Sequence, residues 1–201
     1  MKNTGNLSQK NSRYEIRIAG SGGQGIVLAG IILAEAAILD GKYVTQSQNY
    51  GAEARGGNSI SDVIISDMEV DYPQAVEMDL LVALTQEACT RNLPAMKEGG
   101  IVIVDSTRVR FVPWYYKVAR LPFERIAQKL GEERAINMAA LGAIASLCPI
   151  VSPHSLVTAM AKRLPSAKIE VNHLAFEEAL QAAEKLKQSL TYVETKDEFE
   201  I

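Results

Sequence analysis

The chain has 201 residues, of which 47% are hydrophobic and 22% charged, and its formal net charge at pH 7 is −3. This composition fits one globular domain with a sizeable core. The slightly acidic balance gives no general attraction to nucleic acid. Residues 1–13 lack the apolar segment of a secretory signal, and the most apolar run, 26–39, is too short for a membrane span. We therefore expect a cytoplasmic protein with no membrane and no nucleic-acid partner.

Metal-binding and redox patterns are absent from the sequence. Cys89 and Cys148 lie far apart, and no Cys-x-x-Cys pair occurs, which excludes an iron–sulfur or structural zinc framework. We expect both cysteines to be buried thiols in a reducing compartment. His154 and His173 have no third ligand in register, so we expect no metal bound by this chain.

Apolar strand patterns alternate with helical patterns along the chain. The predicted strands are 15–19, 43–47, 59–66, 80–84, 101–104 and 116–119. The predicted helices are 24–39, 86–96, 122–130, 137–147, 155–164 and 174–190. This alternation predicts a single α/β domain, with an open, mostly parallel sheet and helices on both faces. We expect 1–13 to be a mobile N-terminal segment, 14–190 the domain, and 191–201 an acidic C-terminal tail.

Several residues are expected at the ends of these elements. Gly41 is a candidate cap for the end of the first helix. Asn137 and Asn172 are candidate N-terminal caps of their helices. Gly99 and Gly100 are expected to turn the chain into the fifth strand.

The most informative segment is a glycine loop between the first strand and the first helix. Its residues are Gly20, Ser21, Gly22, Gly23, Gln24 and Gly25, with the spacing G-x-G-x-x-G. In this Rossmann-like context, glycines let the backbone approach a ligand, and the helix N-terminus favours a phosphate or carboxylate. The alternative is that the glycines serve only a tight turn and close helix–sheet packing.

The acidic residue that a nicotinamide dinucleotide site needs is missing. That residue lies about 20 positions after the loop, at the end of the second strand. Here the second predicted strand leads into Gln48, Asn49 and Tyr50. A free-standing dinucleotide-binding oxidoreductase is therefore the weaker interpretation of the motif.

A second loop, 50–57, follows the second predicted strand. Glu53 and Arg55 are flanked only by alanines and glycines, and Gly56 and Gly57 follow them. Carboxyl ends of strands in open α/β sheets form ligand sites, and an arginine offers a fork of donors to anionic groups. The alternative is a solvent-facing hairpin tip with a weak surface ion pair.

An aromatic cluster around Pro113 spans 111–116 and consists of Phe111, Val112, Pro113, Trp114, Tyr115 and Tyr116. Such rings either pack in a core or form a partner-docking surface, because Trp and Tyr are enriched at interface hot spots.

Both loops belong to a set of segments that recur in this order in one known family. The segments are 20–25, 42–46, 50–57, 63–67, 98–100 and 104–106. Over about 15–187, the chain resembles the gamma subunit of 2-oxoacid:ferredoxin oxidoreductases. The loop 50–57 is more similar to the 2-oxoglutarate branch than to the pyruvate or indolepyruvate branches.

The resemblance implies a multisubunit enzyme that decarboxylates 2-oxoglutarate oxidatively with coenzyme A. The products are succinyl-CoA, carbon dioxide and reduced ferredoxin. It also implies that thiamine diphosphate, magnesium and iron–sulfur clusters belong to alpha, beta and delta-type partner subunits. This chain would bind none of these cofactors and would be inactive alone, while helping to bind coenzyme A and closing over the partners' active site.

The resemblance assigns no catalytic residue and no metal ligand to this chain. It places the following residues at an edge that faces coenzyme A or a neighbouring subunit: Gly20, Ser21, Gly22, Gly23, Gln24, Gly25, Tyr50, Glu53, Arg55, Gly56 and Gly57. The Gln24 amide is expected to bond either a ligand or the neighbouring loop. Three alternatives stay open: a gamma subunit for pyruvate or branched-chain 2-oxoacids, a scaffold that binds no small molecule, and a homodimer of the isolated chain.

Overall fold

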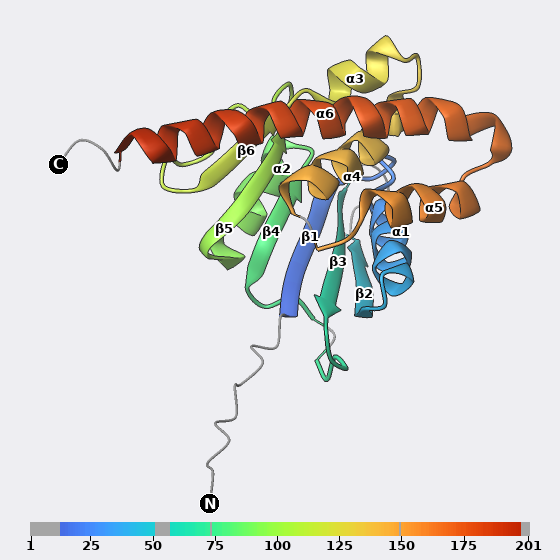
Figure 1. The fold of residues 1–201 in the computed structure, drawn as a ribbon, viewed down its shortest axis with the longest axis horizontal. Coiled ribbons are helices and arrows are strands. Elements are labelled where there is room, and N and C mark those ends of the chain that lie inside the picture. The colour runs from blue at the N-terminus through green and yellow to red at the C-terminus, as the bar shows by residue number, and fades with distance from the viewer. Residues whose placement is uncertain (1–12, 51–56, 73, 149, 198–201) are drawn as a thin grey trace, which may run out of the picture.

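The computed structural model describes residues 13–50, 57–72, 74–148 and 150–197 (Figure 1). The strands are β1 (Arg13–Ser21), β2 (Tyr43–Tyr50), β3 (Asn58–Ser66), β4 (Met78–Ala83), β5 (Met96–Asp105) and β6 (Lys117–Leu121). The α-helices are α1 (Ile26–Leu39), α2 (Gln86–Asn92), α3 (Phe123–Lys129), α4 (Ile136–Leu147), α5 (Pro153–Arg163) and α6 (Ser166–Asp197). Two short 3₁₀ turns, η1 (Leu93–Ala95) and η2 (Glu133–Ala135), complete the described elements.

The described strands form one mostly parallel sheet in the order β2-β3-β1-β4-β5-β6. β1, β4, β5 and β6 pair in parallel, whereas β3 is antiparallel to both of its neighbours, β1 and β2. β3 is therefore the strand that runs against the others. A short connection from β2 allows this, since only antiparallel neighbours can be joined without a crossover. The predicted fold class is confirmed.

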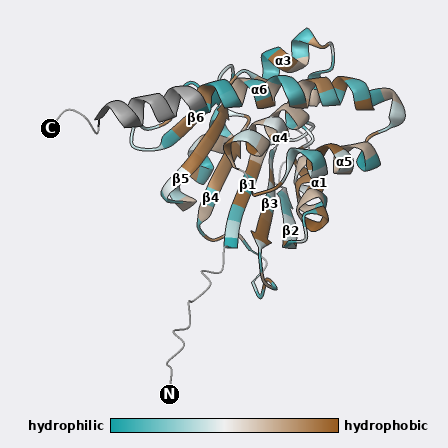
Figure 2. Ribbon diagram, in the orientation of Figure 1, coloured by the Kyte–Doolittle hydropathy of each residue, from teal (hydrophilic) through white to brown (hydrophobic). Residues whose placement is uncertain are grey.

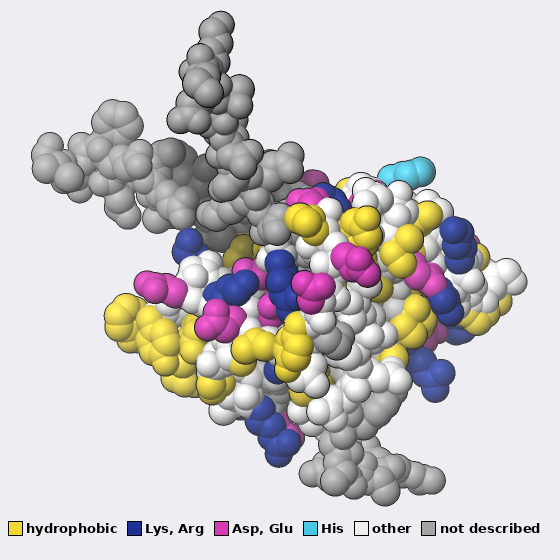
Figure 3. All heavy atoms as spheres, turned by 90° about the horizontal axis from the view of Figure 1, so that it is seen from below, with side chains coloured by type: hydrophobic (Ala, Val, Ile, Leu, Met, Phe, Trp, Pro, Cys, Tyr) yellow, Lys and Arg dark blue, Asp and Glu magenta, His cyan; other side chains and the backbone are white. Residues whose placement is uncertain are grey.

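Helices cover both faces of the sheet, but unequally. One core cluster joins α1, α3, α4, α5 and α6 to side chains such as Ile16, Ile18 and Val82. The other cluster joins α2 to Ala19, Leu81 and neighbouring apolar side chains. In Figure 2 the central strands are largely brown, whereas α6 carries mixed colours. The opposite end of the sheet from the glycine loop carries positive and negative side chains close together (Figure 3).

Two expected boundaries are wrong. Gly99 and Gly100 lie within β5, not before it, and Gly99 has a φ of 78°. The β4–β5 register shifts between Met78 and Leu80, which makes the glycine pair an irregularity inside the strand rather than a turn. The last helix begins at Ser166, directly after Pro165, so Asn172 lies inside it and caps nothing. The Nδ2 of Asn172 donates to the Lys168 carbonyl oxygen at 2.8 Å.

The end of α1 matches the expectation. Gly41 has a φ of 76°, and its N–H donates to the Ile38 carbonyl oxygen at 3.0 Å. A glycine in this left-handed position ends a helix without the strain that a Cβ would add. The domain boundaries at 13 and 190 stay predictions, and 1–12 and 198–201 lie outside the described residues.

Candidate functional site

The glycine loop is held in shape by hydrogen bonds between two of its own residues, Ser21 and Gln24. Ser21 N donates to Gln24 Oε1 at 2.7 Å, and Gln24 N donates to the Ser21 carbonyl oxygen at 3.3 Å. A Cβ at Gly20 would clash with Gln24 Oε1 and Ile26 Cδ1, so a larger residue there would displace the Gln24 side chain that bonds Ser21 N. Of the two expected roles for Gln24, the structure shows the local one, which is to hold the loop in shape.

The N-terminus of α1 opens at this loop without a side-chain cap. Its N-terminal cap residue, Gly25, has a φ of 72°, and no acidic residue occurs in the first turn. The first N–H groups of a helix have no intrahelical partner and carry the positive end of the helix dipole. The N-terminal end of α1 is therefore suited to an anionic group.

The two described ends of the second loop, Tyr50 and Gly57, lie at the same edge of the sheet as the glycine loop. In the strand register, Ser59 of β3 stands opposite Gly20 of β1 on one side and Tyr50 of β2 on the other. Gly22 N donates to the Gly57 carbonyl oxygen at 2.9 Å, which ties the two loops together. Glu53, Arg55 and Gly56 lie outside the described residues, as does the Tyr50 side chain, so their assigned roles stay predictions.

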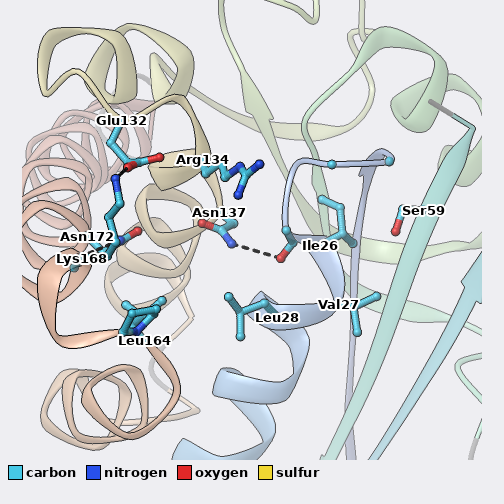
Figure 4. A pocket seen from close by; sticks show the side chains of 14 residues that line it. Ile26, Val27, Leu28, Ser59, Glu132, Arg134, Asn137, Leu164, Lys168 and Asn172 are labelled. Carbon is cyan, nitrogen blue, oxygen red and sulfur yellow. Dashed lines mark hydrogen bonds and ion pairs between the residues drawn. The ribbon is translucent and has the colours of Figure 1, made fainter. Parts of the chain in front are cut away.

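A pocket of ≈690 Å³ lies between the start of α1 and the helices α4 and α6. Its volume is within the range of about 300–1,000 Å³ that is common for small-molecule sites. Figure 4 shows the side chains that line it. They are Gly22, Gly23, Gly25, Ile26, Val27, Leu28, Ser59, Glu132, Arg134, Asn137, Leu164, Pro165, Lys168 and Asn172. The pocket thus combines an apolar floor with a polar and charged wall.

Asn137 joins α4 to the glycine loop from 112 residues away. Its side chain is buried, with 3% of the residue exposed, and its Nδ2 donates to the Gly25 carbonyl oxygen at 3.1 Å. Its Oδ1 accepts no hydrogen bond from the described chain and turns away from the loop, toward Lys168 and Asn172 (Figure 4). The expectation that Asn137 caps its helix is wrong, because the N-terminal cap residue is Ala135.

The sequence around Asn137 also indicates a buried polar contact, which its interpretation as a helix cap does not include. Asn137 and Ser146 are the two polar residues of a helix whose side chains are almost all buried, and Asn137 lies at the end nearest the glycine loop. A polar group in such a place needs a partner. The identity of that partner becomes visible only when α4 packs against the start of α1.

Three charged side chains line the pocket wall. Lys168 pairs with Glu132, and this hydrogen bond, with further attraction from Lys168 and Arg134, holds the pKa of Glu132 below its usual value despite burial. Arg134 makes no side-chain hydrogen bond or ion pair with any described residue. Its guanidinium is therefore available to an anion in the pocket.

A smaller hollow of ≈340 Å³ lies on the other side of the glycine loop. It is lined by Ser21, Gln24, Arg108, Glu124, Arg134 and neighbouring residues. Arg108 and Glu124 form an ion pair there. Arg134 lines both hollows, so it can reach a ligand that bends around the loop.

The aromatic cluster is mostly exposed. Phe111, Trp114 and Tyr115 are 68%, 93% and 65% exposed, which contradicts core packing for these rings. Val112 is buried and Tyr116 packs against the smaller core cluster, so core packing holds for this part of the segment. Gln86 holds the segment in place, because its Oε1 accepts from Arg110 N and Phe111 N at 3.0 Å each. The role of the cluster as a docking surface stays a prediction.

The remaining sequence candidates carry no site chemistry in the described chain. Among the described residues, no group of three metal-ligating side chains is close enough to hold an ion. Both cysteines are buried as expected, and burial raises the pKa of each thiol. Within the same ranges, no helix is both long and apolar enough to cross a bilayer.

Comparison with known proteins assigns the chain to one protein family. Residues 15–182 match the model of the family described as pyruvate ferredoxin/flavodoxin oxidoreductase, and the chain belongs to this family. It is 40% identical over 186 residues to the 2-oxoglutarate synthase subunit KorC of Methanocaldococcus jannaschii, covering 90% of this chain and 100% of that protein.

Two solved structures share the fold. The gamma subunit of a keto/oxoacid ferredoxin oxidoreductase from Geobacter sulfurreducens is 44% identical, with a TM-score of 0.75, over 85% of this chain and 98% of that one. A 2-oxoglutarate:ferredoxin oxidoreductase from Magnetococcus marinus, with 2-oxoglutarate, coenzyme A and succinyl-CoA bound, is 25% identical with a TM-score of 0.78. The match covers 87% of this chain and 31% of that one. The resemblance to the oxidoreductase gamma subunits is confirmed.

Proposed function

We propose that this chain is the gamma subunit of a 2-oxoglutarate:ferredoxin oxidoreductase. The observation that carries the proposal is the match to a 2-oxoglutarate synthase subunit along that protein's entire length. The complex would convert 2-oxoglutarate and coenzyme A to succinyl-CoA and carbon dioxide, and would pass two electrons to ferredoxin.

The chain's own share of this reaction is binding rather than bond breaking. The described residues contain no metal-ligand cluster, and the sequence has no cysteine framework. Thiamine diphosphate, magnesium and iron–sulfur clusters are therefore assigned to alpha, beta and delta-type partners, where they supply the decarboxylation and electron transfer. We expect the complex to be cytoplasmic.

Coenzyme A is the ligand that we assign to the glycine-loop edge. Three features of this edge support the assignment: the uncapped end of α1, the free guanidinium of Arg134 and an adjoining pocket of ≈690 Å³. An anion at this end of α1 would be stabilised by the helix dipole and by charge-assisted hydrogen bonds.

Co-purification with an activity assay tests the proposal. The tagged chain is purified anaerobically from its native cells, and methyl viologen reduction is measured with 2-oxoglutarate, pyruvate or a branched-chain 2-oxoacid, each with coenzyme A. We expect thiamine- and iron–sulfur-bearing partners and a rate that is highest with 2-oxoglutarate. A preference for pyruvate or a branched-chain acid would identify the alternative gamma subunit, and a chain that emerges alone and inactive would refute the proposal.

A scaffold without a ligand role is tested in the same complex. In the predicted second loop, Arg55→Ala should raise the KM for coenzyme A while assembly and kcat are kept. An unchanged KM would remove the second loop from the ligand site.

A further inference from the structure

Helix α1 is apolar on every side, although the chain does not cover all of its sides. Of its 14 residues only Glu35 is charged, and the others are glycine, alanine and larger aliphatic residues. A helix that is apolar all round is normally buried all round. In this structure, however, Ile38 is 60% exposed and Leu39 is 46% exposed. Part of the apolar surface of α1 is therefore open to another molecule.

The open surface of α1 includes a stripe along the length of the helix. Val27, Ile31 and Ile38 follow one another at spacings of four and seven residues. Residues at these spacings share one face of a helix. Val27 and Ile31 are partly exposed and Ile38 is exposed. These three side chains are called the α1 stripe below.

The neighbours of α1 show which way this stripe faces. On one flank of the stripe, Gly30 lies close to the Ser61 side chain of β3, so that flank faces the sheet. On the other flank, Glu35 pairs with Arg163 of α5. The stripe therefore lies between the sheet and α5, at the outer end of the sheet where α1 stands beside β2 (Figure 1).

Strand β2 is an edge strand without the usual protection of an edge. It is 8 residues long, pairs with β3 in an unbroken register, and contains no charged residue and no proline. The opposite edge strand, β6, has 5 residues and carries Lys117 and Arg120. Proteins usually protect an edge by short strands, charges, prolines or bulges, because an unpaired edge can bind another chain. On its outer side, β2 has no partner among the described strands.

The spacing of α1 and β2 fits a second copy of the chain. Helix α1 contacts both β2 and β3, so its axis lies over the space between these strands. If β2 pairs with β2 of a second copy, each α1 lies about 4.8 Å, one strand spacing, from the two-fold axis. The two helices are then about 10 Å apart, which is close to the interaxial distance of roughly 8–10 Å for packed helices. Strand pairing and helix packing can therefore form together.

Ile31 is the stripe residue nearest to that two-fold axis. The middle of β2 lies between Gln46 and Ser47, about 12 Å along the strand from Tyr43. Helix α1 ends at Leu39 and β2 begins at Tyr43, so the helix runs back along the strand. A distance of about 12 Å from the end of the helix corresponds to about eight residues, which leads to Ile31.

We propose that a second copy of this chain docks on β2 and α1. The two β2 strands pair in antiparallel orientation and join the sheets, and the α1 stripes pack against each other. A two-fold interface needs one surface that is complementary to itself, and an uncharged strand beside an apolar stripe meets this condition. The charged residues that flank the surface, Glu35 and Lys42, are each paired with an opposite charge. This contact does not depend on which 2-oxoacid the complex uses.

Light scattering during size-exclusion chromatography of the full chain tests the inference. We expect twice the 21.9 kDa of one chain. Ile31→Asp should weaken the dimer at least tenfold, because it would place a charge against an apolar surface. Trp114→Asp is the matched control, since Trp114 is 93% exposed but lies elsewhere, and it should remain a dimer. A monomeric native chain, or a dimer that only Trp114→Asp disrupts, would overturn the inference. Circular dichroism shows that each variant is folded.

Cysteine crosslinking tests the geometry without adding a charge. Ile31→Cys should form a disulfide with its own counterpart under mild oxidation, since the native Cys89 and Cys148 are buried. Ile38→Cys is the control, because Ile38 is the more exposed residue but lies about 10 Å further along the helix from the axis. It should remain uncrosslinked. Equal crosslinking of both variants, or crosslinking of Ile38→Cys alone, would overturn the inference.

The same variants in the purified complex separate this inference from the proposed function. A disulfide between two copies of Ile31→Cys within the complex supports the docking of a second copy. If a partner subunit covers the α1 stripe instead, Ile31→Asp should lose its thiamine-bearing partners, and Ile31→Cys should not crosslink to itself. That result would overturn the inference and keep the proposed function. A dimer of the chain without oxidoreductase partners would keep the inference and refute the proposed function.

Discussion

The two ends of helix α4 are both buried, yet they make different kinds of contact. In its second half, Gly142 lets the backbone of α6 approach so closely that a Cβ would clash with the Phe176 carbonyl group. At its first turn, Asn137 reaches the backbone of Gly25 and still has an unpartnered oxygen. The contact at Gly142 is a close packing of two backbones. The contact at Asn137 leaves one oxygen without a hydrogen bond beside a pocket.

Within this one helix, the contact at Gly142 serves packing, whereas the contact at Asn137 leaves an atom available for binding. Close helix packing needs small residues and leaves nothing for a ligand to contact. A buried polar group with unused capacity is rare in folded proteins and calls for a specific explanation. We expect substitutions at the Gly142 end to act on stability, and those at the Asn137 end to act mainly on ligand binding.

The largest effect on stability is expected from Gly142→Ala. The added Cβ must displace the α6 backbone, and we expect a loss of about 2–3 kcal/mol and a fall in Tm of about 4–12 °C. Thermal unfolding followed by circular dichroism measures it. Helix propensity alone predicts the opposite sign, because alanine is the better helix former by about 1 kcal/mol. A raised Tm would therefore contradict the close packing of α4 on α6.

Gly25→Ala should be next in size. Its φ of 72° is strained for alanine, and an added Cβ would clash with Asn137 Nδ2. We therefore expect the unfolding free energy to fall by about 2 kcal/mol and the binding of coenzyme A to weaken. Gly131→Ala is the control, since Gly131 has a φ of 68° with open space around it. It should lose about 1 kcal/mol from backbone strain alone. Equal losses of stability in the two variants would mean that the contact with Asn137 is not close.

Glu132→Gln should change affinity more than stability. Its pKa is lowered in the folded state, first by the hydrogen bond from Lys168. The ionised form therefore adds stability above the unfolded value of 4.5, and this stability is lost as the pH falls through the lowered folded pKa. Urea unfolding should show a small difference between variant and native protein at pH 7 and none at low pH.

The same variant should bind coenzyme A about threefold more tightly, because Lys168 is freed and one negative charge is removed from the pocket. Titration at neutral pH checks this increase. Weaker binding would show that Glu132 itself contacts the ligand.

The smallest effect is expected from Ser146→Ala. Removing a buried hydroxyl that has no partner relieves its desolvation penalty, while the packing changes little. We expect the unfolding free energy to stay within about 0.5 kcal/mol of the native value or to rise slightly. A loss above about 1 kcal/mol would indicate that the Ser146 hydroxyl has a partner.

Much of this protein follows from local sequence. Alternating strand and helix patterns predicted the α/β class, and the glycine spacing placed a loop between β1 and α1. These features depend on hydrophobic periodicity and on the backbone freedom of glycine, which act over a few neighbouring residues. Six short segments in a fixed order, among them 20–25 and 50–57, also indicated the family.

Other features were decided only by the tertiary structure. The reversed direction of β3, the irregularity at Gly99 and the early start of α6 depend on which elements become neighbours. The pocket is the clearest case, since Asn137 and Gly25 are separated by 112 residues. Alone, Asn137 is typical of a helix cap. Packing of α4 over the start of α1 buries the Asn137 side chain beside the pocket, engages its Nδ2 and leaves its Oδ1 without a partner in the described chain.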